Sequence, residues 1–126
     1  MGYYSNFTYY LESAKVDTKK VQELESFFSN EENDNDISGF LNVAIDVDDI
    51  DSEIATIEDI SPEDDYGKFY DDHLFAEKLS AALVSGLIEI YFVGEDGISW
   101  GYRVLPNEVY TMSTQWVVDD PNYPID

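Results

Sequence analysis

The chain of 126 residues contains no cysteine, and its only histidine is His73. Without cysteine there is neither a disulfide framework nor a thiolate zinc site, which fits a reducing cytosol. A cysteine nucleophile is excluded, and His73 would have to serve every histidine-dependent step. His73 falls in the first turn of an expected helix, where a capping or surface role accounts for it. We therefore expect no enzymatic activity and no cofactor.

Cations are scarce: six lysines and arginines stand against 28 aspartates and glutamates, a formal net charge of −22. This charge opposes direct binding to nucleic acid or to an anionic membrane. No apolar run approaches the ~20 residues of a membrane-spanning helix, and the first residues, MGYYSN, lack the basic and apolar parts of a secretion signal. We expect an intracellular protein of the host cytoplasm with basic partner proteins.

The apolar content is too high for a disordered acidic tail. Hydrophobic residues make up 44% of the chain and aromatic residues 15%, whereas disordered acidic segments combine high charge with few aromatics. A chain of this length forms one hydrophobic core. We expect a single domain over residues 1–118, followed by a C-terminal tail over 119–126 that contains two prolines.

Two patterns of apolar residues divide the chain into strands and helices. Alternation, or a short apolar run, predicts strands at 3–12, 40–47, 54–60, 87–93, 98–105 and 108–118. Helical spacing predicts helices at 17–30 and 73–85, the second of them ended by Gly86. This order predicts an α+β fold, with a mainly antiparallel sheet of about five or six strands and two helices on one face.

Each predicted helix has an apolar stripe that is expected to be buried. In the first helix the stripe consists of Val21, Leu24 and Phe28. In the second helix it consists of Leu74, Phe75, Leu79, Ala82 and Leu83, with the stem of Lys78.

One segment partly matches a calcium-binding loop. Asp34, Asp36 and Ser38 occupy the first, third and fifth positions of an EF-hand loop, and Gly39 occupies the sixth. The twelfth position, which should carry a bidentate glutamate, is Ile45, and the residues around it alternate like a strand. A divalent-cation site at Asp34, Asp36 and Ser38 is therefore an alternative hypothesis.

The strongest signal is the concentration of acidic residues in the middle of the chain. Between Lys20 and Lys68 there are sixteen carboxylates and no cation, so no local partner neutralises them. Solubility needs only a few charges, spread over all faces. A dense carboxylate array can instead occupy the place of a nucleic-acid backbone among lysines and arginines. The predicted partner-binding residues are Asp46, Asp48, Asp49, Asp51, Glu53, Glu58, Asp59, Glu63, Asp64 and Asp65.

Aromatic residues near this array could anchor a partner or stand in for bases. The candidates are Tyr66, Phe69, Tyr70 and Tyr123. For Phe69 and Tyr70, packing in the core is the favoured interpretation.

In size, charge and lack of a catalytic set, the chain resembles phage-encoded DNA-mimic inhibitors, the class that contains anti-restriction and anti-CRISPR proteins. Separately, MGYYSNF at 1–7, KFYDDH at 68–73 and GEDGISWGYRV at 94–104 are similar to a family of small phage and bacterial α+β proteins of unknown function. The second resemblance implies a fold but no activity.

The leading hypothesis is an acidic mimic that blocks the cationic nucleic-acid-binding groove of a host defence protein, either a CRISPR effector or a restriction enzyme. Two alternatives stay open: the calcium-binding module described above, and an immunity or antitoxin protein that masks a basic nuclease. The oligomeric state is also open, and a homodimer could form through sheet edges, Trp100 or Trp116.

Overall fold

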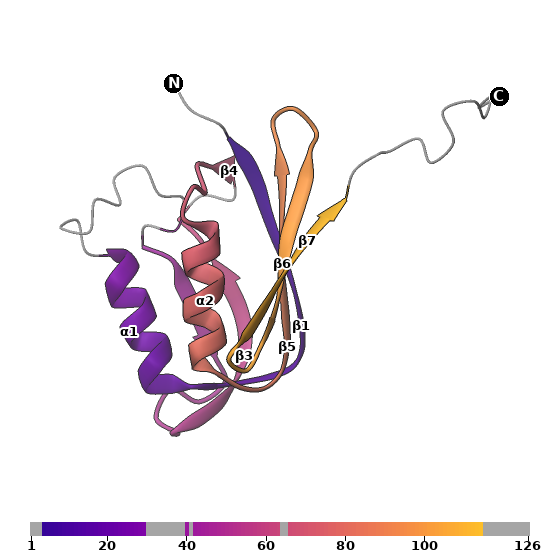
Figure 1. Cartoon of the computed structure of the whole chain (residues 1–126). Coiled ribbons are helices and arrows are strands. Elements are labelled where there is room, and N and C mark those ends of the chain that lie inside the picture. The colour runs from indigo at the N-terminus through magenta and orange to yellow at the C-terminus, as the bar shows by residue number, and fades with distance from the viewer. Residues whose placement is uncertain (1–3, 30–39, 41, 64–65, 115–126) are drawn as a thin grey trace.

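A seven-stranded sheet carries both helices on one of its faces (Figure 1). The computed structural model describes residues 4–29, 40, 42–63 and 66–114. The elements are β1 (Ser5–Asp17), α1 (Thr18–Ser29), β2 (Ala44–Val47), β3 (Ile54–Ser61), β4 (Tyr66–Gly67), α2 (Asp72–Ala82), β5 (Leu83–Gly94), β6 (Ser99–Leu105) and β7 (Glu108–Thr114). The predicted α+β fold is confirmed. The additional strand is the two-residue β4.

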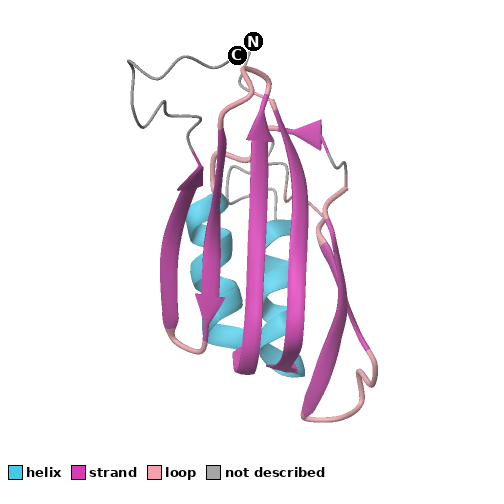
Figure 2. Cartoon of the chain, turned by 90° about the vertical axis from the view of Figure 1, so that its right-hand side faces the viewer, coloured by secondary structure: helices cyan, strands magenta, loops and turns pink. Residues whose placement is uncertain are grey.

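All neighbouring strands are antiparallel, in the order β2-β3-β1-β5-β6-β7, and β4 pairs with the start of β1. β5 lies inside the sheet between β1 and β6, as its nearly continuous apolar composition predicts. Figure 2 looks onto the face that the helices leave uncovered, with the β2–β3 hairpin at one side. The hairpin is therefore an edge of the sheet.

β1 is longer than the sequence pattern predicts because a bulge restores its alternation. Ser13 has a φ of 47°, and the register with β5 shifts between Glu12 and Lys15 and again between Lys15 and Val16. Ala14 and Val16 are buried, continuing the face that Phe7 begins. The bulge turns the end of the strand back toward the core.

Gly86 belongs to β5 and does not end the second helix, which corrects the prediction. α2 ends at Ala82, because Leu83 is already extended (φ −74°, ψ 127°). Gly86 has a φ of +87°, and a Cβ built there would lie 2.2 Å from the carbonyl oxygen of Ser13. The backbones of β1 and β5 approach closely at the bulge, where only glycine fits.

α1 follows the sequence pattern closely. Val21, Leu24 and Phe28 are buried as predicted. The carboxylate of Asp17 accepts hydrogen bonds from the backbone amides of Lys19 (3.0 Å) and Lys20 (3.2 Å). Asp17 is thus the N-terminal cap that satisfies two of the first free amides of the helix.

The apolar stripe of α2 is narrower than predicted. Phe75, Leu79, Ala82 and Leu83 are buried, but Leu74 is 38% exposed. The prediction for Leu74 is therefore wrong, and the helix packs with a narrower face toward the sheet.

An aromatic cluster fills the space between the helices and the sheet. Phe40 is fully buried and stacks on Phe75 of α2, with ring centroids 3.9 Å apart. Further rings surround this pair: Phe7, Phe28, Phe69 and Phe92. Phe69 is in the core, as favoured, but Tyr70 is 53% exposed, so core packing is wrong for Tyr70.

Within the described residues, no helix has the length and apolar character needed to span a membrane.

Candidate functional site

Seven of the ten predicted partner-binding acids lie in one hairpin. The acidic hairpin consists of β2, β3 and the turn between them, residues 44–61. Its acids are Asp46, Asp48, Asp49, Asp51, Glu53, Glu58 and Asp59. Glu63 follows β3, is exposed and accepts a hydrogen bond from the side-chain amide of Asn42 (3.2 Å). Asp64 and Asp65 lie outside the described residues, as do the candidate calcium ligands Asp34, Asp36 and Ser38.

The hairpin forms because its apolar residues can be buried on one side. Ile45 on β2 and Ala55, Ile57 and Ile60 on β3 are buried. Asp46 and Glu58 are exposed. This apolar-in, acidic-out arrangement is the one that the alternation of residues 40–47 predicts.

A bulge in β3 keeps two consecutive acids out of the core. Asp46 pairs with Asp59 and Val47 pairs with Ile57, so Glu58 is the extra residue on β3. In a regular strand Glu58 and Asp59 would point to opposite faces, and one of them would face the core. The bulge allows Ile57 and Ile60 both to be buried while Glu58 is exposed and Asp59 half-buried.

Two carboxylates oppose each other across the acidic hairpin. Asp46 and Asp59 are direct cross-strand partners in the β2–β3 register, and like charges in such positions destabilise a sheet. Among the described residues, the ion pairs are His73–Glu77 and Arg103–Glu89, and neither involves the hairpin. The repulsion between Asp46 and Asp59 is therefore not offset by an ion pair in this part of the chain.

Asp59 is held in its charged form by hydroxyl donors. The hydroxyls of Ser61 and Tyr9 both donate hydrogen bonds to its carboxylate. The bond from Ser61, followed by the bond from Tyr9, lowers the pKa of Asp59 below its usual value. The same contact with Asp59 raises the pKa of Tyr9. Asp59 thus stays negative beside Asp46 at neutral pH.

In the turn, the hairpin's own donors fix two carboxylates. Asp48 accepts a hydrogen bond from the backbone amide of Thr56 (2.9 Å). Asp49 accepts from the hydroxyl of Ser52 (2.7 Å) and the amide of Asp51 (3.1 Å). These bonds, that from the Ser52 hydroxyl first, lower the pKa of Asp49. The carboxylates of Asp48 and Asp49 are therefore preorganised.

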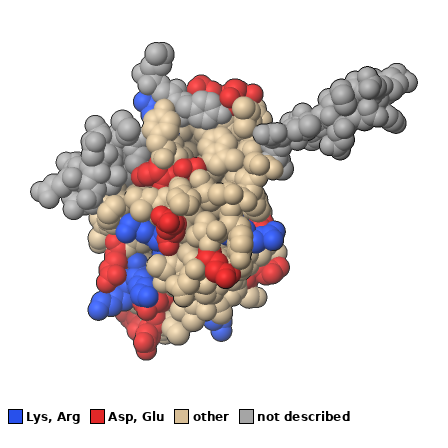
Figure 3. All heavy atoms as spheres, viewed as in Figure 1, with Lys and Arg blue, Asp and Glu red and all other residues tan. Residues whose placement is uncertain are grey.

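The tip of the hairpin rests on the start of α1. Thr18 donates from its backbone amide to the Glu53 carbonyl (3.0 Å) and from its hydroxyl to the Ser52 carbonyl (2.6 Å). Lys19 and Lys20 follow directly in α1. Figure 3 shows atoms of both charge signs interspersed at the lower left, the end where α1 begins in Figure 1. Charges of both signs meet at the tip, whereas the strands of the hairpin carry acids alone.

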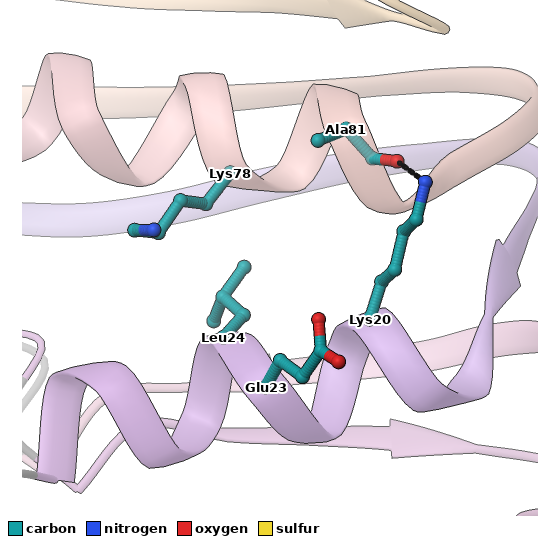
Figure 4. Close-up of a pocket in the computed structure, with 5 residues that line it drawn as sticks. All are labelled: Lys20, Glu23, Leu24, Lys78 and Ala81. Carbon is teal, nitrogen blue, oxygen red and sulfur yellow. Dashed lines mark hydrogen bonds between the residues drawn. The ribbon is translucent and has the colours of Figure 1, made fainter.

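A shallow groove of about 200 Å³ separates α1 from α2 (Figure 4). It is lined by Lys20, Glu23, Leu24, Lys78 and Ala81. The ammonium group of Lys20 donates to the carbonyl of Ala81 (3.4 Å), close to the end of α2, where a cation is favourable. Lys78 lies over the ring of Phe27, 4.1 Å from its centroid. Both lysines therefore help to pack the two helices together.

The carboxylate of Asp72, the first residue of α2, links this helix to β6. The sequence pattern did not predict this contact. Asp72 accepts hydrogen bonds from the indole of Trp100 (2.7 Å) and the hydroxyl of Tyr102 (3.0 Å). Burial, with Asp72 nearby, raises the pKa of Tyr102. Trp100 is the sequence signal that could have predicted this contact, because the indole N–H of a half-buried tryptophan needs a hydrogen-bond acceptor. Asp72 therefore has a structural contact with the core.

His73 lies on the surface, as its sequence position predicts. Its imidazole Nδ1 is 3.8 Å from the carboxylate of Glu77, one turn along the helix, and both side chains are more than half exposed. Within the part of the chain that the structure describes, no three histidine or acidic side chains are placed to hold a metal ion.

The chain matches no known protein family, no curated protein and no solved structure.

Proposed function

We propose that the chain is a non-enzymatic inhibitor whose acidic hairpin occupies the cationic nucleic-acid-binding groove of a host defence protein, a CRISPR effector or a restriction enzyme. The observation that carries the proposal is the β3 bulge, which brings Glu58 and Asp59 out of the core on the strand opposite Asp46. No cation compensates these acids within the described ion pairs.

The uncompensated charge favours a basic partner over no partner. The like-charged pair Asp46–Asp59 lowers the stability of the free hairpin. Lysines and arginines of a partner would offset this repulsion on binding. The net charge of −22 would also speed the encounter with a positive groove.

The carboxylates of the hairpin are fixed in position. This favours mimicry of a nucleic-acid backbone over binding that depends on the net charge alone. Asp48, Asp49 and Asp59 are oriented by hydrogen bonds from their own neighbours. A preorganised array loses little conformational freedom on binding. Residues that grip nucleic-acid phosphates are charged donors, and carboxylates accept the same charge-assisted hydrogen bonds.

The test compares two variants that lose the same number of charges. The hairpin variant combines Asp46→Asn, Asp51→Asn and Glu58→Gln. In the wild-type chain the carboxylates of these three residues accept none of the hydrogen bonds described above. Each chain is immobilised, and proteins bound from a bacterial lysate are identified at low salt and as the salt concentration rises. We expect the wild-type chain to capture a nucleic-acid-binding protein, and the hairpin variant to bind it roughly tenfold or more weakly.

The matched control combines Glu23→Gln, Glu77→Gln and Glu95→Gln, three exposed acids outside the hairpin. This control is expected to retain most of the affinity because the local array is intact. Equal losses in the two variants would contradict the proposal, since net charge alone would then explain binding. Capture of a partner that the hairpin variant binds unchanged would also contradict it.

A further inference from the structure

The two edges of the sheet are protected to different degrees. β2, at one edge, has four residues, and the carboxylate of Glu25 accepts a hydrogen bond from the backbone amide of Ile45 (2.8 Å). Its exposed Asp46 adds a charge at the same edge. A short strand, a charged side chain and a covered amide are the features by which proteins prevent edge-to-edge pairing. The β2 edge is therefore closed to another strand.

β7, at the other edge, is longer, and the single protective feature it shares with β2 is a charge at its first residue. It runs for seven residues with an unbroken register against β6, from Leu105↔Glu108 to Ser99↔Thr114. It contains no proline, no lysine and no bulge, and its one charge, Glu108, lies at its first residue. Among the described strands none lies beyond it. Such an edge is a template for strand addition.

The hairpin geometry shows which backbone groups β7 offers. The two-residue loop Pro106–Asn107 makes Leu105 and Glu108 the closing hydrogen-bonded pair of the β6–β7 hairpin. Because successive residues alternate direction in an antiparallel ladder, the residues after Glu108 that point away from β6 are Val109, Thr111 and Ser113. These three residues present their backbone N–H and C=O groups to the outer edge.

We propose that two copies of the chain associate through β7, antiparallel, about a two-fold axis that passes between their Thr111 residues. In this register Val109 pairs with Ser113 of the second copy, which joins the outward groups of both strands. Tyr110 lies opposite Met112 of the second copy. Tyr110 is 52% exposed and borders a surface hollow of about 410 Å³ that Met112 also lines. The contact between a methionine sulfur and an aromatic ring favours this pairing.

For two copies of the chain, the distribution of charge favours the β7 edge over the β2 edge. Glu108 of each copy faces Thr114 of the other, so the two glutamates lie at opposite ends of the ladder, about 20 Å apart. The two acidic hairpins lie at the far ends of the combined sheet, eleven strand spacings or about 50 Å apart. That separation exceeds the Debye length of about 8 Å at physiological salt several times. Association through β7 thus keeps the most acidic parts of two equally charged chains apart.

The test measures the mass of the full chain by sedimentation velocity over a wide range of concentrations. We expect the mass to rise from 14.4 kDa toward twice that value. Higher salt should strengthen the association, because it screens the repulsion between two chains of charge −22. Binding of the acidic hairpin to a basic partner has the opposite salt dependence, so failure of one proposal is distinguishable from failure of the other. A chain that stays monomeric at all concentrations and salt conditions would overturn the dimer.

Two charge variants test the register. Thr111 is exposed, so Thr111→Lys and Thr111→Asp can each fold, and each places two like charges opposite one another at the two-fold axis. We expect each variant to dissociate at least tenfold more readily, and the equimolar mixture to recover the association as a heterodimer. Circular dichroism checks that both variants are folded.

The control variant is Thr8→Lys. Thr8 is an exposed residue of β1 on the uncovered face of the sheet, away from β7. It should leave the association unchanged. A dimer that Thr8→Lys disrupts and the Thr111 variants do not would overturn the proposal in favour of face-to-face packing of the two sheets. A mixture of the Thr111 variants that stays monomeric would overturn the register.

Discussion

The hydroxyl of Tyr9 on β1 donates a hydrogen bond to the carboxylate of Asp59 on β3. The two strands pair with each other only at Lys15–Asp17 of β1. Beyond that pairing, the contact from Tyr9 links the acidic hairpin to the body of the sheet. The same contact orients a carboxylate of the proposed binding surface. One hydrogen bond therefore both holds the hairpin against the sheet and stabilises the negative charge of Asp59.

Replacing Tyr9 with phenylalanine should release Asp59 without creating a cavity. We expect the pKa of the Asp59 carboxyl to rise, because it loses a donor that stabilises the charged form. The free energy of unfolding should fall by about 1 kcal/mol. NMR titration of the Asp59 carboxyl and urea denaturation measure these two effects. In the control, Tyr10→Phe removes a hydroxyl that donates to Glu12; an equal shift of Asp59 in both variants would refute the assignment.

Neutralising Asp46 should stabilise the free protein. Asp46→Asn removes the repulsion with Asp59 across the β2–β3 register, and we expect a gain of roughly 0.5 kcal/mol in the free energy of unfolding. Because the effect is electrostatic, it should shrink at high salt. Denaturation at two salt concentrations checks both statements. A loss of stability, or a gain that salt does not reduce, would show that Asp46 makes a favourable contact in the folded chain.

Alanine substitutions at Gly86 and Gly97 distinguish the energetic cost of a positive φ from the cost of steric crowding. Both have a positive φ, +87° and +85°. A Cβ at Gly97 meets nothing within 4 Å, whereas a Cβ at Gly86 meets the carbonyl of Ser13. We expect Gly97→Ala to cost about 1 kcal/mol and Gly86→Ala to cost about 3 kcal/mol, because crowding adds to the strain. Thermal or chemical denaturation of the two variants measures these losses of stability. Similar losses in both variants would rule out the close approach of β1 and β5 at the bulge.

The stability of the fold should decrease at high pH. Burial, followed by the hydrogen bond to Glu89, raises the pKa of Tyr91 to about 12, and burial also raises that of Tyr102. Tyrosine in an unfolded chain ionises near pH 10. Above that pH the unfolded chain holds fewer protons than the native chain, so the free energy of unfolding falls as pH rises. The stability from these tyrosines is complete below about pH 10 and decreases toward pH 12.

Denaturation curves across this pH range measure the effect, and phenolate absorbance follows the ionisation. Tyr91→Phe should make the decrease less steep, because one of the shifted groups is removed. Stability that stays constant from about pH 10 to 12 would contradict the burial of these hydroxyls.

Local periodicity predicts those parts of the fold that depend on neighbouring residues. The burial of Val21 and Phe28 follows from helical spacing, and the outward position of Asp46 follows from alternation. The fold class follows from the order of such segments.

The features that the sequence did not predict depend on distant contacts. Phe40 adjoins a polar stretch, yet it stacks on Phe75, thirty-five residues away. The need for glycine at position 86 arises from the Ser13 bulge on another strand. The outward position of both Glu58 and Asp59 depends on a bulge that only the pairing with β2 defines. The acidic composition identified the hairpin residues, but their arrangement comes from these contacts.

The most direct measurement of the proposed function is a competition between the chain and double-stranded DNA for a captured partner protein. The partner is bound to fluorescently labelled DNA, and the chain or its hairpin variant is added while fluorescence anisotropy is recorded. The account predicts that the wild-type chain displaces the DNA completely and that the hairpin variant needs a roughly tenfold or higher concentration. Simultaneous binding of DNA and the chain to the partner would contradict it.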